Sequence, residues 1–424
     1  MDQPPMNGER YKPSVNIAQA PRILAPLLYL STAYGFLVAA AVMLIEYAKL
    51  VSDGAYGDFN VIMMVHFFTL GFLSMTAMGV LNQWVPVVFD VPSVEIRRVS
   101  LNFALYLLGV LGFALGLAMQ QLTLLAVSGA LLALAILLWS GGVGHQLARS
   151  VKPRDAAYWG LQGAIIGFNA VWILGVFMVL SFFGWWPEYQ VLRVHIATAI
   201  VGWMGLLVLT VQQKLNPMFS MSKAEGVRFG VPLYLAAGGV LMSWVSLLTS
   251  TAWLRLGAIV WTAAVLVAVA QSFRVVRQGK FKTFDRVFVG VAAAWVLLLA
   301  AAVFSFWLSP LAVILAFWGL MTLIMSYQAR IAPFIVAVAV ARRLPGPIFK
   351  AFFMAQAMHA KHLPVGTGIL GIVGAALAVM GRVTMCPDLE VASGAVVLLL
   401  VAWHLGGIVV AMAQGRRQAP PAQP

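Results

Sequence analysis

The chain has 424 residues, of which 62% are hydrophobic and only 9% are charged. No stretch between the apolar segments is long enough to form a separate soluble domain, so one membrane domain has to carry the function. The formal net charge of +14 comes from lysines and arginines that gather at the ends of apolar segments. Basic residues in such places face anionic lipid headgroups, so we do not expect nucleic acid as a partner.

The chain divides into a membrane domain between two short tails. Residues 1–22 are polar and contain proline, which predicts a cytoplasmic N-terminal tail without a cleavable signal peptide. Residues 23–414 are expected to form a single transmembrane domain, and residues 415–424 a disordered cytoplasmic tail. About twelve apolar segments, each of roughly 20 residues, are long enough to cross a bilayer. They lie at 24–48, 60–88, 99–119, 122–144, 157–183, 191–216, 229–249, 252–273, 288–308, 310–335, 365–381 and 393–413.

The basic residues indicate how the segments are oriented. If the N-terminal tail and the first connection lie on opposite sides, only Lys49, Arg193, Arg255 and Arg382 fall on the side of that connection, and all other lysines and arginines fall on the opposite side. The positive-inside rule then places both termini in the cytoplasm and makes the number of spans even. We therefore expect a multi-pass protein of a bacterial-type inner (plasma) membrane, with the lipid bilayer as its main partner.

The second and sixth segments resemble each other. Gly71 precedes Pro86 by the same number of residues as Gly202 precedes Pro217, so the two segments superpose with their prolines at the inner end. A fainter echo occurs in the tenth segment, over residues 318–334. Because the likeness recurs at every fourth helix, we predict an all-α membrane protein with about twelve transmembrane helices, arranged as three four-helix quartets around a pseudo-threefold axis.

Three glycines are candidate binding residues because they let another group approach the helix backbone. Gly71 and Gly79 are eight residues apart, close to two helical turns, so they share one face of the second segment. Gly202 is the counterpart of Gly71 in the sixth segment. The group that approaches is either a flat ligand or simply a neighbouring helix, since small residues commonly pack transmembrane helices.

Two histidines stand near the outer ends of these related segments. A histidine within a span is costly, so a functional role is the first hypothesis for His66 and His195. Both lie at a similar depth, and two neutral imidazoles that face each other from neighbouring helices suit a six-coordinate haem iron. The alternative is that each imidazole forms a hydrogen bond with Ser, Thr or a backbone carbonyl of another helix.

Two further histidines have weaker positions. His404 lies near the middle of the last segment, where it is either a third metal ligand or a packing residue with hydrogen bonds. His145 lies at the inner end of the fourth segment beside Arg149, which is typical of an interfacial residue.

The spacing of His66, Gly71-Phe72, Gly79 and Pro86 resembles the first signature of the NnrS family of haem- and copper-associated membrane proteins. The twelve spans, the repeat at every fourth helix and the histidine at the outer end of the sixth segment are similar to subunit I of the haem-copper oxidase and nitric oxide reductase superfamily. This resemblance implies an axial haem ligand at His66 and a copper ligand at His195.

The sequence departs from the superfamily at several motifs. The seventh segment has no adjacent histidine pair, the tenth has no histidine, and His195 is followed by Ile-Ala-Thr in place of Pro-Glu-Val-Tyr. The additional histidines and the His-Thr-Gly run of the NnrS family are also absent from the sequence. A binuclear site needs several imidazoles to hold copper beside an open iron. We therefore expect haem without a full copper–haem centre.

Two classes of function stay open. The resemblance implies respiratory electron transfer or nitric oxide handling, with a redox partner protein or a diatomic gas as the ligand, and an oxidoreductase if the chain is an enzyme. The alternative is a transporter or assembly factor for a metal or a small uncharged solute, without haem. No Asp or Glu lies in the middle third of any segment, and this argues against transport coupled to a proton relay.

Overall fold

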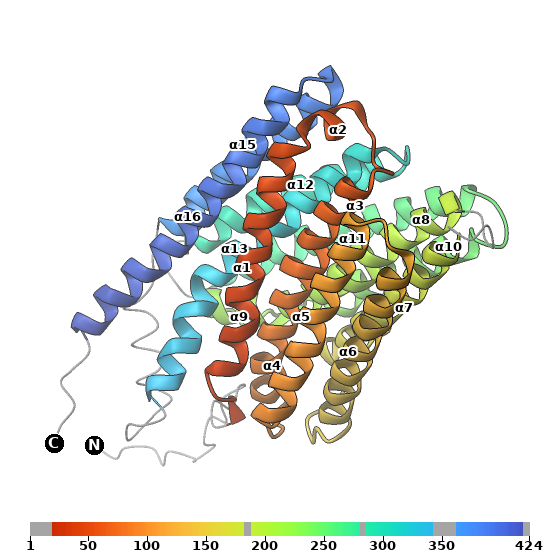
Figure 1. Ribbon diagram of the computed structural model, residues 1–424. Helices are drawn as coiled ribbons and strands as arrows, with labels where there is room; N and C mark the ends of the chain where they lie inside the picture. Colours follow the sequence, from red (N-terminus) through yellow and green to blue (C-terminus); the bar gives the residue numbers. More distant parts are fainter. Residues whose placement is uncertain (1–18, 182–187, 280–284, 342–361, 419–424) are drawn as a thin grey trace, which may run out of the picture.

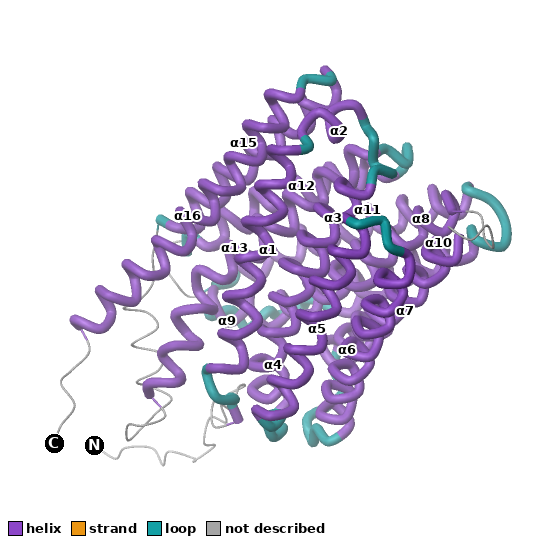
Figure 2. The backbone as a smooth tube through the Cα atoms, viewed as in Figure 1, coloured by secondary structure: helices purple, strands orange, loops and turns teal. Residues whose placement is uncertain are grey.

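The computed structural model describes residues 19–181, 188–279, 285–341 and 362–418. In these residues all regular structure is helical and no strand occurs (Figure 2). This is the expected result for long apolar segments, because a helix pairs its own backbone N–H and C=O groups where no water is available. Residues 1–18 and 419–424 of the predicted tails lie outside the described residues. Residues 415–418 belong to the last helix, which ends two residues before Pro420.

The helices follow one another with short connections (Figure 1). Their bounds are α1 Leu24–Glu46, α2 Ala48–Asp53, α3 Phe59–His66, the π-helix η2 Phe67–Ser74, α4 Met75–Phe89, α5 Ile96–Ala118, α6 Leu122–Ala148, α7 Ala156–Ser181, α8 Glu188–Ala197, the π-helix η3 Thr198–Gly205, α9 Leu206–Ser220, α10 Gly230–Val245, α11 Ala252–Arg277, α12 Val287–Ser305, α13 Pro310–Ala341, α15 Leu363–Thr384 and α16 Pro387–Gln418.

Eleven helices of the described chain are long and apolar enough to cross a membrane, and α3–η2–α4 and α8–η3–α9 each count as one of them. The twelfth predicted segment is α10, an apolar helix of only 16 residues. The prediction of an all-α polytopic membrane protein with about twelve helices is thus confirmed. Large apolar side chains cover the outside of the bundle, among them Leu108, Leu241 and Ile166, which are 59%, 67% and 68% exposed. A surface of this kind suits lipid contact.

Neighbouring helices pack as antiparallel pairs. The closest pairs are α5 with α6, α10 with α11, α12 with α13, and α15 with α16. The α15–α16 pair lies along one side of the bundle beside α1, so the first and last spans are neighbours (Figure 1). Residues from most helices contribute to one continuous apolar core.

The resemblance between the second and sixth spans extends to the backbone. Each span contains a π-helical segment of eight residues, Phe67–Ser74 in one and Thr198–Gly205 in the other. Gly71 and Gly202 are both the fifth residue of their segment. π-Helical turns are rare and are frequent at functional sites, so their recurrence at equivalent positions is strong support for the repeat.

The same register continues to the inner ends of the two spans. Pro86 and Pro217 lie inside α4 and α9, and both helices end at a left-handed residue, Asp90 with φ 55° and Met221 with φ 52°. The third span of the series, α13, runs without a π-helical segment over its described length. The structure thus supports the repeat for the first two quartets, and the pseudo-threefold arrangement stays a prediction.

The connection after α6 ties down the end of α4. Lys152 Nζ donates to the Val88 carbonyl at 2.7 Å, and Ser150 Oγ donates to the Phe89 carbonyl at 2.8 Å. These bonds satisfy carbonyls that a helix leaves unpaired at its C-terminus. Desolvation by burial lowers the pKa of the Lys152 ammonium below its ordinary value.

Candidate functional site

His66 is the last residue before the first π-helix. Asp58 begins α3 as an N-cap whose side chain accepts from Asn60 N at 2.8 Å, and this fixes the helix that carries the histidine. The imidazole is half-buried and lies against Phe113 of α5, with 5.0 Å between ring centroids. Nδ1 lies 2.7 Å from the Ile62 carbonyl, one turn earlier. Nε2 is therefore the ring nitrogen that is left for a ligand.

His195 lies near the start of the sixth span, on α8. It is the eighth residue of its helix, as His66 is of α3, so each lies about 10 Å beyond the start at 1.5 Å per residue. The half-buried ring faces α7, where the Val171 backbone interacts with it as a hydrogen-bond acceptor and Gly175 lies beside it. The Val171 contact is of the kind that the alternative to a metal ligand predicted for this histidine. Its Nδ1 is buried and has no hydrogen-bond partner among the described residues.

The two imidazoles are near enough to interact electrostatically. Their helices are held together about two turns farther along, where Trp203 Nε1 of η3 donates to Ser74 Oγ of η2 at 3.1 Å. Trp203 is itself stacked on Phe168 of α7, with ring centroids 4.2 Å apart. The structure thus brings the two predicted ligands together at one end of the bundle, between the starts of the second and sixth spans.

The histidines are not equivalent positions of the repeat. When Gly71 is superposed on Gly202, His66 falls on Ala197, two residues after His195. The offset corresponds to about 3 Å along the helix axis. His66 and His195 therefore stand at different positions of the repeat, and internal symmetry does not relate them.

Two of the three candidate glycines, Gly71 and Gly79, serve helix packing in this structure, whereas a Cβ added at Gly202 would meet its nearest side chains at an ordinary 3.4 Å. A Cβ added at Gly71 would lie 2.5 Å from Cβ of Phe36, and one added at Gly79 would lie 2.7 Å from Cβ of Tyr29, both on α1. α1 thus covers the face of the second span that Gly71 and Gly79 share. Of the two expectations for this face, a flat ligand or a neighbouring helix, the structure shows the neighbouring helix. Gly202 is the counterpart on η3, where a Cβ added at Gly167 of α7 would collide with its carbonyl. A role for these glycines in cofactor binding stays a prediction.

His404 lies apart from this pair in its contacts. It is fully buried on α16 at 0% exposure, and its ring stacks on Tyr34 of α1 with 5.9 Å between centroids. Neither ring nitrogen has a hydrogen-bond partner among the described residues. His404 therefore packs against a neighbouring helix as expected, but the expected hydrogen bonds to its ring are not found among the described residues. A buried polar atom without a partner costs about 1–3 kcal/mol.

No three side chains of His, Cys, Asp or Glu gather as a metal site within the part of the chain that the structure describes. His404 therefore does not join His66 and His195 in a three-ligand group there. Two imidazoles alone suit an iron whose other ligands come from a porphyrin, because a bare copper or zinc ion generally takes three or four protein ligands.

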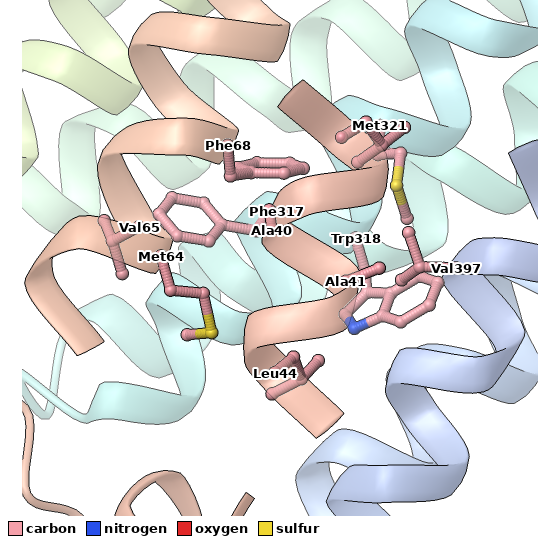
Figure 3. Close-up of a pocket in the computed structure, with 11 residues that line it drawn as sticks. Ala40, Ala41, Leu44, Met64, Val65, Phe68, Phe317, Trp318, Met321 and Val397 are labelled. Atoms are coloured by element: carbon pink, nitrogen blue, oxygen red, sulfur yellow. The ribbon is translucent and has the colours of Figure 1, made fainter. Parts of the chain in front are cut away.

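Sequence reasoning missed the partners of these histidines. Phe113, Val171 and Gly175 belong to helices that the chain reaches only after a turn, and ordinary apolar residues give no signal of their neighbours. Sequence reasoning also missed an apolar cavity of about 90 Å³ between α1, the second span, α13 and α16 (Figure 3). Met64 and Val65, immediately before His66, line it.

Comparisons with protein-family models and with curated proteins find no match to this chain. The resemblance to the NnrS family and to subunit I of the haem-copper oxidases therefore stays a prediction that rests on the residues quoted for it. A function for this chain has to be argued from the geometry of its histidines.

Proposed function

We propose that this protein is an integral membrane haem protein in which His66 and His195 bind the iron. The observation that carries the proposal is the pair itself. The two half-buried imidazoles lie on spans that the Trp203–Ser74 hydrogen bond joins. His66 has its Nδ1 at the Ile62 carbonyl, which leaves Nε2, and the buried Nδ1 of His195 has no hydrogen-bond partner in the described residues. Intramembrane histidines are costly unless they have such a role.

The surroundings of His66 support this role. An imidazole whose Nδ1–H is held by a backbone carbonyl presents the lone pair of Nε2 in a fixed direction, as in most metal-binding histidines. The Ile62 carbonyl supplies that contact. Phe113 beside the ring keeps water away on one side. A bound haem would supply one-electron chemistry, and the apolar side chains around it would set its potential through burial.

The membrane context favours a role in respiratory electron transfer or nitric oxide handling. We propose the bacterial-type inner membrane as its location, with both termini cytoplasmic, because the basic residues lie mostly on one side of the spans. The His66–His195 pair would then lie near the periplasmic face, within reach of a redox partner protein. A diatomic gas would reach the iron if one imidazole dissociates.

The test is the haem content of the purified protein. Protein expressed with sufficient haem supply should be coloured, with a Soret band and close to one haem per chain in a pyridine haemochrome assay. His66→Ala and His195→Ala should each lose most of the haem or change its coordination, because each variant removes one ligand. His145→Ala is the matched control and should retain the wild-type spectrum.

A colourless protein that folds normally would contradict the proposal. So would a haem spectrum that both His66→Ala and His195→Ala leave unchanged, because the iron would then have other ligands. Size-exclusion chromatography in detergent shows whether each variant is folded.

A further inference from the structure

His404 marks an unassigned buried polar site on the side of the bundle that α16 forms. Its imidazole is 0% exposed and lies between α16 and α1, yet both ring nitrogens lack a hydrogen-bond partner among the described residues. A neutral imidazole has one N–H donor and one acceptor nitrogen. The donor and the acceptor nitrogen of His404 are both buried, and a buried group without a hydrogen bond is costly.

A second unpartnered group is linked to His404 through Tyr34. The Tyr34 hydroxyl donates to Gln328 Oε1 of α13, and the Tyr34 ring stacks on the His404 ring. Since Oε1 accepts this bond, the other end of the amide is the donor Nε2. That nitrogen is buried and has no partner in the described chain. Tyr34 and Gln328 are 7% and 3% exposed, so bulk water does not reach them.

The unpartnered nitrogens of Gln328 and His404 determine which hydrogen-bonding groups a bound molecule would need. Gln328 Nε2 and one nitrogen of His404 are donors, and the other nitrogen of His404 is an acceptor. A guest therefore needs acceptor capacity for two bonds and a donor for one. A carbonyl oxygen with its two lone pairs and an adjacent N–H meet that need, and this is the chemistry of a primary amide or a urea. Water offers the same donors and acceptors in a smaller volume.

The guest has to be neutral. Few charged side chains are described on the three helices that carry the site. Glu46 of α1 and Asp388 and Glu390 of α16 lie near helix ends, and Arg330 of α13 is already paired with Asp285, at 2.5 Å. A charged guest beside His404 would have no counter-ion, and an isolated charge in such a place is expensive.

The apolar cavity lies between α1, the second span, α13 and α16 (Figure 3). Its lining residues Val397 and Met321 lie seven residues before His404 and Gln328, two turns along the same faces. The Phe72 ring of η2 lies beside Phe68 of the cavity wall, with 5.8 Å between ring centroids, and beside Tyr34, with 6.0 Å between ring centroids.

We propose that Tyr34, Gln328 and His404 form a binding site for a small, neutral, amide-like molecule with a carbonyl oxygen and an N–H. The site is independent of the proposed haem site, because none of its three side chains belongs to the His66–His195 pair. Its function and that of the haem site can therefore fail separately.

The test uses formamide and formate, which have the same shape but differ in charge. Magic-angle-spinning NMR of the protein in lipid bilayers, with ¹⁵N-labelled histidine, reports the ring nitrogens directly, and His404→Phe identifies the His404 signals among those of the six histidines. Formamide should shift the His404 signals and saturate, and formate should leave them in place.

Gln328→Leu removes one donor and should weaken formamide binding about tenfold, as expected for the loss of one hydrogen bond. Gln146→Leu is the matched control: Gln146 is a buried glutamine of α6 whose Nε2 donates to the Pro92 carbonyl, so formamide binding should not change. If His404→Phe does not fold, Gln328→Leu still tests the site through the titration.

Two results would overturn the proposal. If the His404 signals exchange with water and do not respond to formamide, the site holds water only and the amide class is wrong. If they respond neither to water nor to formamide, or respond equally to formate, no neutral donor–acceptor site exists there. Haem content has no bearing on either result, so the two proposals are judged separately.

Discussion

Histidines in this membrane domain differ in what surrounds their ring nitrogens. His66 has one nitrogen at a carbonyl, His195 has an unpartnered Nδ1 beside α7, and His404 has two unpartnered nitrogens against Tyr34, as far as the described residues show. An imidazole with an uncommitted nitrogen is ready to bind a metal or a hydrogen-bonding guest. These surroundings assign His66 and His195 to one proposed site and His404 to another.

Gly71 provides a prediction about packing at the same scale. Gly71→Ala would place a methyl group 2.5 Å from Cβ of Phe36, an atom that cannot rotate away from its backbone. We expect a loss of about 1–3 kcal/mol in the free energy of unfolding, visible as a lower melting temperature in detergent. Gly35→Ala is the control on α1, because an added Cβ there meets nothing within 4 Å. Equal melting temperatures for the two variants would refute the close α1–η2 packing.

At the scale of elements, paired π-helical segments distinguish the second and sixth spans from the others. Trp203 and Ser74 join the two segments directly, Gly71 lets α1 approach η2, and Gly167 of α7 lets α7 approach η3. A π-helical turn accommodates one extra residue and changes the direction of the side chains before it. His66 immediately precedes η2 and His195 lies three residues before η3, so both proposed ligands stand beside such a segment.

An ion pair links three elements at the opposite end of the bundle. Arg330 Nη2 of α13 lies 2.5 Å from Asp285 Oδ2, both side chains are largely buried, and the guanidinium lies over Phe219 at the end of α9. Asp285 Oδ1 also accepts from Val287 N at the start of α12. We expect Asp285→Asn to cost about 3 kcal/mol of stability, because it leaves the arginine without its counter-ion.

The control for this variant is Asp53→Asn. Asp53 pairs with Lys49 at 3.0 Å, but the two side chains are 45% and 79% exposed. Exposed pairs contribute little, so we expect a change within about 0.5 kcal/mol. Chemical denaturation in detergent measures both variants, and an equal effect of the two would contradict the structural role of the buried pair.

At the scale of the whole molecule, the number of spans determines sidedness. If the short helix α10 crosses the bilayer together with the eleven longer ones, the number of crossings is even. The start of α1 and the end of α16 then lie on one side, and the α15–α16 connection lies on the other. Cys386 lies in that connection and is partly exposed. As the only cysteine of the chain, it should react with a membrane-impermeant maleimide in cells whose outer membrane is permeabilised, and Cys386→Ala should not. Protection of Cys386 until the cytoplasmic membrane is lysed would reverse the proposed orientation.

The helices could be predicted from the sequence because bilayer thickness sets a minimum apolar length, and the observed bounds lie close to the predicted ones. The π-helical segments could not be predicted from the sequence. Their i→i+5 hydrogen bonds depend on backbone geometry, and the residue types of Phe67–Ser74 do not indicate that geometry. The Tyr34–Gln328 bond joins residues 294 apart in the chain. Such a contact depends on how the spans are arranged, which one sequence does not reveal.

The repeat and the histidine pair illustrate the same limit. Gly and Pro spacing predicted that the second and sixth spans are related, because those residues act on their own helix. The spacing did not predict that α1 fills the glycine face, since that requires knowledge of which helix lies next to it. The predicted haem ligands are brought together, and haem itself stays a prediction.

The most direct test of the haem proposal is electron paramagnetic resonance of the oxidised, purified protein. Two imidazole ligands should give a low-spin ferric signal, and His66→Ala and His195→Ala should each convert it to a high-spin signal or abolish it. The absence of any ferric haem signal from folded protein supplied with haem would contradict the proposal, as would a low-spin signal that survives in both variants.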